Sequence, residues 1–349
     1  NEYGVYKNDD RIAGETEGSS ASNVTIEDLN FYQCGWNGIG IPKGSDNITI
    51  DNCEISYSGG QNQVNNGYAR RGQCINTQGD ISYLTISNCI VSEGWDGGIA
   101  LQGWMDNLNV YQVRVHHNVI YNNEYGFEIW GIKPTSDISY VFFENNTCFY
   151  NGYGWANDHR DSLKKKGSSF FHWSFEGFSE HIYIRNNIFY KDRAPSFYVY
   201  DARNDNWKNI STNYNLYYKG LPGSAPESDR AYWFTDYDPR GDESYFSSAN
   251  SPHLYTFDEA SSFRSMAGQD WQSLLEQDPL FTSMGAPGPG MTDFDVILRD
   301  GSPAAGSGKI INAYINHIDL WGNVQGSGSF NMGAFAGEPF LEEIGRAHV

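Results

Sequence analysis

Residues 113–160 contain two copies of one pattern, VRVHHNVIYNNEYGFEIWG and VFFENNTCFYNGYGWAND, within VRVHHNVIYNNEYGFEIWGIKPTSDISYVFFENNTCFYNGYGWANDHR. Each copy has an apolar run, an Asn, a second apolar run, a polar turn, and a Gly followed by alternating large residues. The period of two predicts short strands, and Asn or Gly marks each bend. Because such a unit cannot bury its own apolar side, it must stack on neighbouring copies.

The same pattern recurs along the chain at intervals of 24, 36, 30, 28, 41 and 28 residues. The residues aligned at the bend are Asp28, Asn52, Asn88, Asn118, Asn146, Asn187 and Asn215. Asn side chains stacked at one bend can hydrogen-bond along the stack. We expect the residues that follow them to form one interior file: Cys53, Cys89, Val119, Thr147, Ile188 and Leu216.

With three short strands per copy and no helical periodicity between copies, the chain resembles the right-handed parallel β-helix of the pectate-lyase-like superfamily. The resemblance covers about 23–218, and DFDVILRDGSPAAGSG and DLWGNVQGSGSFNMGAFAG look like the closing coils of bacterial members. A β-sandwich also has many short strands, but would not repeat an Asn-apolar pair at one bend. We therefore expect an all-β solenoid, a single domain over 1–349.

Within that domain we expect coils over about 23–218, a loop region over about 221–277 and closing coils over about 278–337. Residues 259–277 (EASSFRSMAGQDWQSLLEQ) predict one short helix, in which Leu274 and Leu275 follow Trp271 at helical spacing. Gly268 weakens its middle.

A net charge of -20, from 43 acidic and 23 basic residues, argues against nucleic acid and anionic membranes as partners. No apolar run approaches the roughly 20 residues of a membrane span. The five Cys residues form no CxxC pair and fall at interior positions of the repeat, which favours buried thiols over disulfides or metal ligands. The abundance of Tyr, Trp, Asn and Gly is typical of a secreted or periplasmic bacterial protein that handles carbohydrate. We expect a monomer without cofactor or metal; a structural calcium at Asp201, Asn204 and Asp205 is a weak alternative.

The strand after each Gly bend alternates between inward and outward residues. One outward file is Gly40, Asn76, Ala100, Glu128 and Ala156, and the other is Pro42, Gln78, Gln102, Trp130 and Asp158. Amides hydrogen-bond sugar hydroxyls, and an indole packs on the apolar face of a pyranose. The outward surface therefore has the side chains of a sugar-binding site.

Glycoside hydrolysis needs two carboxyl groups, and Glu128 with Asp158 is the leading pair. Rungs about 4.8 Å apart and a two-residue offset of about 6.8 Å place their Cα atoms on the order of 8 Å apart. That separation favours the inverting window of about 6.5 to 9.5 Å and leaves a retaining arrangement open. Asp96, in the bend GWDGG, is a third catalytic candidate. In a plainer interpretation, Glu128 is a solvated strand residue and Asp158 caps its loop.

The candidate sugar-binding residues are Trp130, Gln102, Gln78, Asn76, His159, Arg160 and His172. His159 and Arg160 are equally suited to a salt bridge within their loop. His116 and His117 lie at a different bend, where a structural or exposed position is expected.

At the level of motifs, the closest resemblance is to bacterial β-helix glycoside hydrolases, including those that act on xylan-type hemicelluloses. It implies a secreted enzyme that cleaves a plant or microbial polysaccharide. A polysaccharide lyase remains an alternative, with bases among Lys164, Lys165, Lys166, Arg160, Arg70 and Arg71 and with Tyr68 or Tyr153 as acid. The basic strand motifs and acidic calcium clusters of lyase families are missing from the coils. A third alternative is a carbohydrate-binding adhesin without a matched carboxyl pair.

Overall fold

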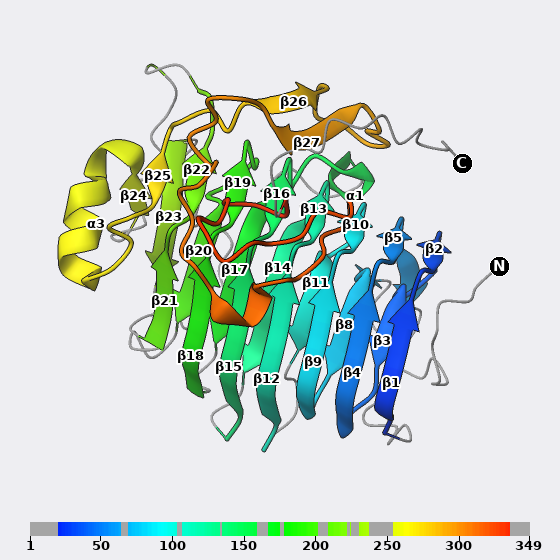
Figure 1. Ribbon diagram of the computed structural model, residues 1–349. Coiled ribbons are helices and arrows are strands. Elements are labelled where there is room, and N and C mark those ends of the chain that lie inside the picture. The colour runs from blue at the N-terminus through cyan, green and yellow to red at the C-terminus, as the bar shows by residue number, and fades with distance from the viewer. Residues whose placement is uncertain are drawn as a thin grey trace.

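The computed structural model of the 349-residue chain describes residues 20–63, 69–102, 107–132, 135–158, 167–174, 178–201, 209–221, 224, 230–236 and 254–335. Three long sheets, stacked strand upon strand, form the sides of a solenoid (Figure 1). We call these sheets A, B and C. Along the chain, each coil adds one strand to sheet B, then one to sheet C, then one to sheet A. The predicted parallel β-helix is therefore confirmed.

Sheet A contains β3 (Ile39–Ile41), β8 (Ile75–Gln78), β11 (Gly97–Gln102), β14 (Tyr125–Ile132), β17 (Ser168–Ser174), β20 (Phe197–Asp201) and β23 (Ala231–Asp236), with β24 (Leu254–Thr256) antiparallel at its edge. Sheet B contains β1 (Ser22–Glu27), β4 (Ser45–Asp51), β9 (Ile81–Ser87), β12 (Asn109–His116), β15 (Asp137–Glu144), β18 (Phe178–Arg185) and β21 (Ile210–Asn213). Sheet C contains β2 (Asn30–Tyr32), β5 (Glu54–Ser56), β10 (Ile90–Ser92), β13 (Val119–Tyr121), β16 (Thr147–Phe149), β19 (Ile188–Tyr190), β22 (Leu216–Tyr218) and β25 (Leu274–Leu275).

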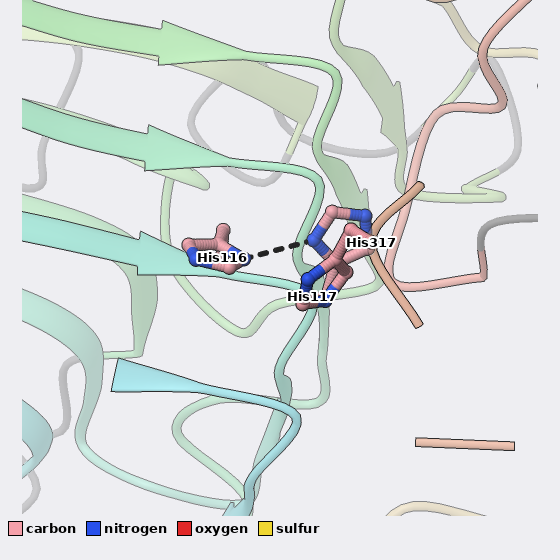
Figure 2. Close-up of side chains that lie close together, drawn as sticks. All are labelled: His116, His117 and His317. Atoms are coloured by element: carbon pink, nitrogen blue, oxygen red, sulfur yellow. Dashed lines mark hydrogen bonds between the residues drawn. The ribbon is translucent and has the colours of Figure 1, made fainter. Parts of the chain in front are cut away.

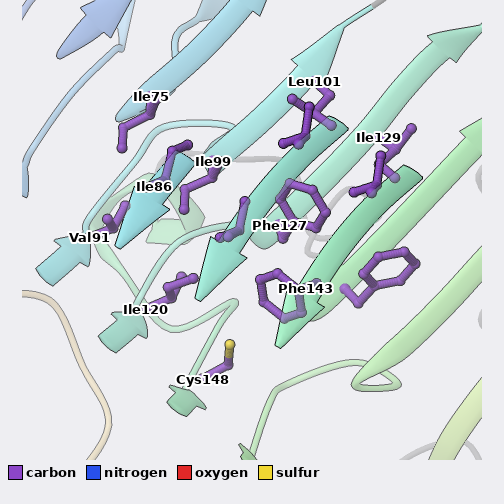
Figure 3. Packing of buried hydrophobic residues seen from close by; sticks show 14 of the residues in the cluster. Ile75, Ile86, Val91, Ile99, Leu101, Ile120, Phe127, Ile129, Phe143 and Cys148 are labelled. Atoms are coloured by element: carbon purple, nitrogen blue, oxygen red, sulfur yellow. The ribbon is translucent and has the colours of Figure 1, made fainter. Parts of the chain in front are cut away.

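Apolar side chains from all three sheets fill the interior (Figure 3). In sheet A the inward files run through Ile75, Ile99 and Phe127 and through Leu101 and Ile129, as predicted. Burying each such side chain contributes roughly 1.5–3 kcal/mol to folding. All five Cys residues are buried and free, which confirms that they are not paired in disulfides.

A ladder of Asn side chains lines the corner at which the chain passes from sheet B to sheet C. Asn118 Nδ2 donates to Asn146 Oδ1 at 3.0 Å, Asn146 Nδ2 to Asn187 Oδ1 at 3.1 Å, and Asn187 Nδ2 to Asn215 Oδ1 at 3.0 Å. All four residues are fully buried. The predicted ladder is confirmed over these coils.

The predicted register of the earlier coils is wrong by one residue. Ser87 of β9 pairs with His116 of β12, so Asn88 aligns with His117 rather than with Asn118. The interior position beside Asn118 is therefore occupied by Cys89, whose backbone N–H donates to Asn118 Oδ1 at 2.9 Å. The outer position of this corner has a positive φ in each coil, and its residues include Asn52, Asn88, His117, Asn145 and Asn186.

The short helix predicted within 259–277 is confirmed, but it covers only the first part of that stretch. The η5 turn (Phe257–Glu259) leads into α3 (Ala260–Ala267), which ends at Gly268 with a φ of 66°. Gly tolerates this left-handed cap without strain. Leu274 and Leu275 form β25, which pairs with β22 and extends sheet C.

The chain from 278 to 335, here called the C-terminal segment, adds no strand to the three long sheets, so the predicted closing coils are wrong. It contains the antiparallel hairpin of β26 (Phe281–Met284) and β27 (Phe294–Leu298), and the η6 turn (Asn312–Tyr314). Figure 1 shows the hairpin, in orange, above the short strands of sheet C. Its apolar residues pack with those on the outer face of sheet C, which is thereby covered. No helix among the described residues is long and apolar enough to cross a membrane.

Candidate functional site

The predicted outward file of sheet A is confirmed up to Glu128. Asn76, Ala100 and Glu128 pair in register on β8, β11 and β14, between residues that face the core. Asn76 and Glu128 are nevertheless 1% and 5% exposed, and Gln102 is also buried. Gln78 is exposed. These polar groups are thus held in place before any ligand binds.

The next coil does not place Asp158 beside Trp130. Strand β17 stacks on β14, with Phe171 opposite Glu128 and Trp173 opposite Trp130. Residues Trp155–Asp158 form the short helix α1 instead. The predicted alignment of this segment, on which the separation of about 8 Å was based, is wrong. The Asp158 side chain, His159 and Arg160 lie outside the described residues, so their roles stay predictions.

Helix α1 lies at the corner where the chain passes from sheet C to sheet A. The backbone N–H of Trp155 donates to Glu93 Oε2 at 2.8 Å, and its indole donates to the Glu93 carbonyl at 2.6 Å. The indole also packs edge-on against Trp95, with ring centroids 5.0 Å apart. Since Trp95 and Asp96 lead directly into β11, α1 borders the end of sheet A at which Asp96 lies.

Five aromatic side chains cover neighbouring coils of the outer face of sheet A, and we call them the aromatic cluster. Tyr125 stacks on Phe171 at 4.1 Å, Phe171 contacts Tyr198 at 5.0 Å, and Trp130 contacts Trp173 at 5.0 Å between ring centroids. Trp130 and Trp173 are partly exposed. Tyr125, Phe171 and Tyr198 are buried, so the two indoles are the rings that can pack on the apolar face of a sugar.

The Glu128 carboxyl extends from the aromatic cluster toward Asp96. Its Oε2 lies 3.4 Å from the position that a Cβ on Gly97 would occupy, and Cγ of Gln73 lies 3.6 Å from that position. Asp96 Oδ2 accepts a hydrogen bond from the backbone N–H of Gly72 at 3.0 Å. Asp96 is thus hydrogen-bonded to the chain at Gly72, and the Glu128 carboxyl lies against Gly97, the residue that follows Asp96.

A further carboxylate, Glu124, was missed by the sequence reasoning. Gly97 pairs with Tyr125, so Asp96 and Glu124 occupy the same position in successive coils, which lie about 4.8 Å apart. Glu124 is buried. Aligning WDGGI with NEYGF would have revealed the repeated acid.

The expected role of His172 in substrate binding is wrong. His172 does lie on the strand that follows the loop, but it is in register with Ile129 and Val199, which belong to the core. It is fully buried, and its Nε2 lies 3.0 Å from Ser179 Oγ on sheet B, across the interior. It therefore faces away from the outer surface.

Of the residues proposed for the lyase alternative, only Tyr153 has a described side chain, so that alternative is not tested. Tyr153 packs with the cluster on the outer face of sheet C, and the Arg193 guanidinium lies 5.7 Å from its ring. Outside the described residues or side chains lie Tyr68, Arg70, Arg71, Lys164, Lys165, Lys166, Asp201, Asn204 and Asp205.

The sequence of residues 17–170 matches the family model described as a right handed beta helix region. The match includes the coils that carry Asn76, Asp96 and Glu128, and agrees with the three parallel sheets. These coils therefore form a right-handed parallel β-helix. A search of curated proteins found no match to the chain.

Proposed function

We propose that the outer face of sheet A binds a polysaccharide and that the protein hydrolyses its glycosidic bonds. The observation that supports this most is that the Glu128 carboxyl lies against Gly97, the residue after Asp96, on the strand that also carries Trp130 of the aromatic cluster. Right-handed β-helix regions are common in enzymes that act on polysaccharides, which is compatible with this activity. We further propose a secreted enzyme, because such a polymer lies outside the cell.

Glu128 and Asp96 provide the two carboxyl groups of the reaction. One donates a proton to the oxygen of the leaving sugar, and the other, ionised, activates water or attacks the anomeric carbon. Asp96 replaces Asp158 in our assignment because it immediately precedes Gly97, against which the Glu128 carboxyl lies. Glu124, one coil from Asp96, is a supporting acid.

The polysaccharide lies along the solenoid axis in this proposal. It then passes the exposed amide of Gln78 on β8, the carboxyl groups, and the aromatic cluster on β14, β17 and β20. Amides fix the orientation of sugar hydroxyls, and rings bind the apolar faces. The order of these groups favours an extended chain over a single sugar.

The test is release of reducing ends from a panel of neutral and uronic polysaccharides, xylan-type polymers among them, with ultraviolet absorbance of the products. We expect saturated products, and a loss of at least 100-fold in kcat for Glu128→Gln and Asp96→Asn. The matched control is Asp300→Asn, an exposed acid in the C-terminal segment. Unsaturated products would replace the proposal by a lyase, and binding without turnover by an adhesin.

A further inference from the structure

Three His side chains meet at the corner between sheets B and C, away from sheet A (Figure 2). His116 ends β12, His117 is the next residue with a φ of 56°, and His317 comes from the C-terminal segment. One ring nitrogen of each lies within 4.8 Å of the other two. Residues 200 positions apart in the chain thus present three nitrogen ligands together.

The tautomer of His317 follows from its neighbour Asn88. Asn88 Nδ2 donates to Asp51 Oδ1 at 3.0 Å and to the Ile318 carbonyl at 3.2 Å, which fixes the orientation of the amide. Asn88 Oδ1 therefore faces His317 Nε2, 3.1 Å away, and accepts its proton. The lone pair of His317 is then on Nδ1. A second ring nitrogen held in this way is typical of metal-binding His.

The imidazoles of His116 and His117 face each other through their Nδ1 atoms. These nitrogens lie 3.0 Å apart, close to the roughly 3.3 Å that separates two nitrogens bound at 2.0–2.1 Å to one tetrahedral ion. His117 is fully buried, and its Nε2 has no hydrogen-bond partner among the described residues. Neutral imidazole is the form that binds metal.

Glu144, the carboxylate on the next coil, already has two partners. Glu144 forms an ion pair with Arg185 and accepts a hydrogen bond from the Tyr314 hydroxyl at 2.7 Å. The Tyr314 ring packs on His116, with centroids 4.5 Å apart. The donor set is therefore three neutral imidazoles, which suits borderline ions such as Zn²⁺ better than Ca²⁺ or Mg²⁺.

We propose that His116, His117 and His317 bind one Zn²⁺ ion, which fastens the C-terminal segment to the solenoid. Water completes the four-coordinate shell. A rotation of the His317 ring, which is on the outer segment, brings its Nδ1 to the spacing set by the other two. The site is independent of the proposed hydrolase, since it lies at a different corner.

The experiment uses the full chain, free of any affinity tag and stripped with a chelator. Titration with Zn²⁺ in a calorimeter should give one ion per chain, and Co²⁺ should give the visible spectrum of a tetrahedral nitrogen site. His317→Ala should weaken Zn²⁺ binding at least tenfold. The matched control, His181→Asn, changes an exposed His on sheet B that stacks on Tyr140, and should leave binding unchanged.

A second measurement distinguishes loss of a zinc ligand from misfolding of the variant. Zn²⁺ should raise the melting temperature of the wild-type chain and protect the C-terminal segment from proteolysis, and should do neither in a His317→Ala variant with unchanged circular dichroism. Absence of saturable binding by the wild-type chain overturns the proposal. So does binding of equal affinity in His317→Ala.

Discussion

The carboxyl of Glu128 lies over Gly97, although its backbone pairs with Ala100, three residues further along β11. A Cβ at Gly97 would lie at ordinary contact distance from the carboxyl, so only a side chain larger than that of Ala would press against it. This relationship places an acid from the middle of β14 beside Gly97, the residue after Asp96 at the start of β11. The geometry of the proposed site therefore depends on a small residue at position 97 as well as on the acids.

Gly97→Val should lower turnover without unfolding the protein. The new Cβ would lie 3.4 Å from Glu128 Oε2, and the γ carbons would reach the space of the carboxyl itself. We expect kcat to fall at least tenfold, with a change in melting temperature of only a few degrees. Gly288→Val, at a position with nothing within 4 Å of a new Cβ, is the control. Full activity in Gly97→Val would show that the position of Glu128 is irrelevant.

Asn146→Ala should destabilise the solenoid by about 2–4 kcal/mol, because it leaves several buried polar groups unpaired. Its side chain accepts from the backbone and side chain of Asn118 and donates to Val115 and Asn187. Urea unfolding measures the change. Asn109→Ala, at an exposed position on β12, should change stability by less than about 0.5 kcal/mol. Equal effects would mean that the ladder adds nothing.

Trp130→Ala should weaken polysaccharide binding roughly tenfold or more, because a partly exposed indole of the aromatic cluster is lost. Affinity electrophoresis or calorimetry on the inactive Glu128→Gln background measures binding apart from turnover. Trp271 is 53% exposed and lies outside the cluster, so Trp271→Ala is the control. Loss of affinity in both variants, or in neither, counts against the assigned surface.

Asp192 should give stability a defined dependence on pH. Burial raises the pKa of its carboxyl to about 6, against the lowering effects of Lys219 and Ser169. The folded chain therefore binds this proton more tightly than the unfolded chain, whose Asp pKa is about 3.9. The stabilising contribution is fully present below about pH 4 and is lost as pH rises through about 6. A shift of roughly two units corresponds to about 3 kcal/mol.

Asp192→Asn removes this titration. Its stability relative to the wild-type chain should rise by about 2–3 kcal/mol between pH 4 and pH 7, as measured by urea unfolding at each pH. A difference that does not change with pH would contradict a raised pKa of Asp192 in the folded chain.

The fold was predictable because each repeat is a local pattern, formed by residues that are neighbours in the sequence. Alternation of apolar and polar residues and an Asn at each bend gave the parallel coils and the inward files of sheet A. The predicted register was wrong at the corner between sheets B and C, where two adjacent positions can both hold a polar residue. In Asn145 and Asn146 both are Asn, whereas the same two positions are Asn88 and Cys89 in an earlier coil. Aligning on Asn alone therefore shifted one group of coils by a residue.

The site was predictable only in part because similar local motifs serve different purposes. YGWAND resembles YGFEIW, yet Gly154 is required because a Cβ there would lie 1.8 Å from the Asn122 carbonyl, and the chain then turns into α1. The strand that stacks on β14 begins at Ser168, beyond a long loop. Contacts such as that between Asn88 and His317 join distant parts of the chain, so no local sequence pattern predicts them.

The most direct test of the proposed hydrolase compares wild-type protein and Glu128→Gln on one polysaccharide that the wild-type chain degrades. Binding of the polymer and release of reducing ends are measured on the same preparations. We predict that Glu128→Gln binds within about threefold of wild type while its turnover falls at least 100-fold. Turnover by Glu128→Gln at the wild-type rate would contradict the account.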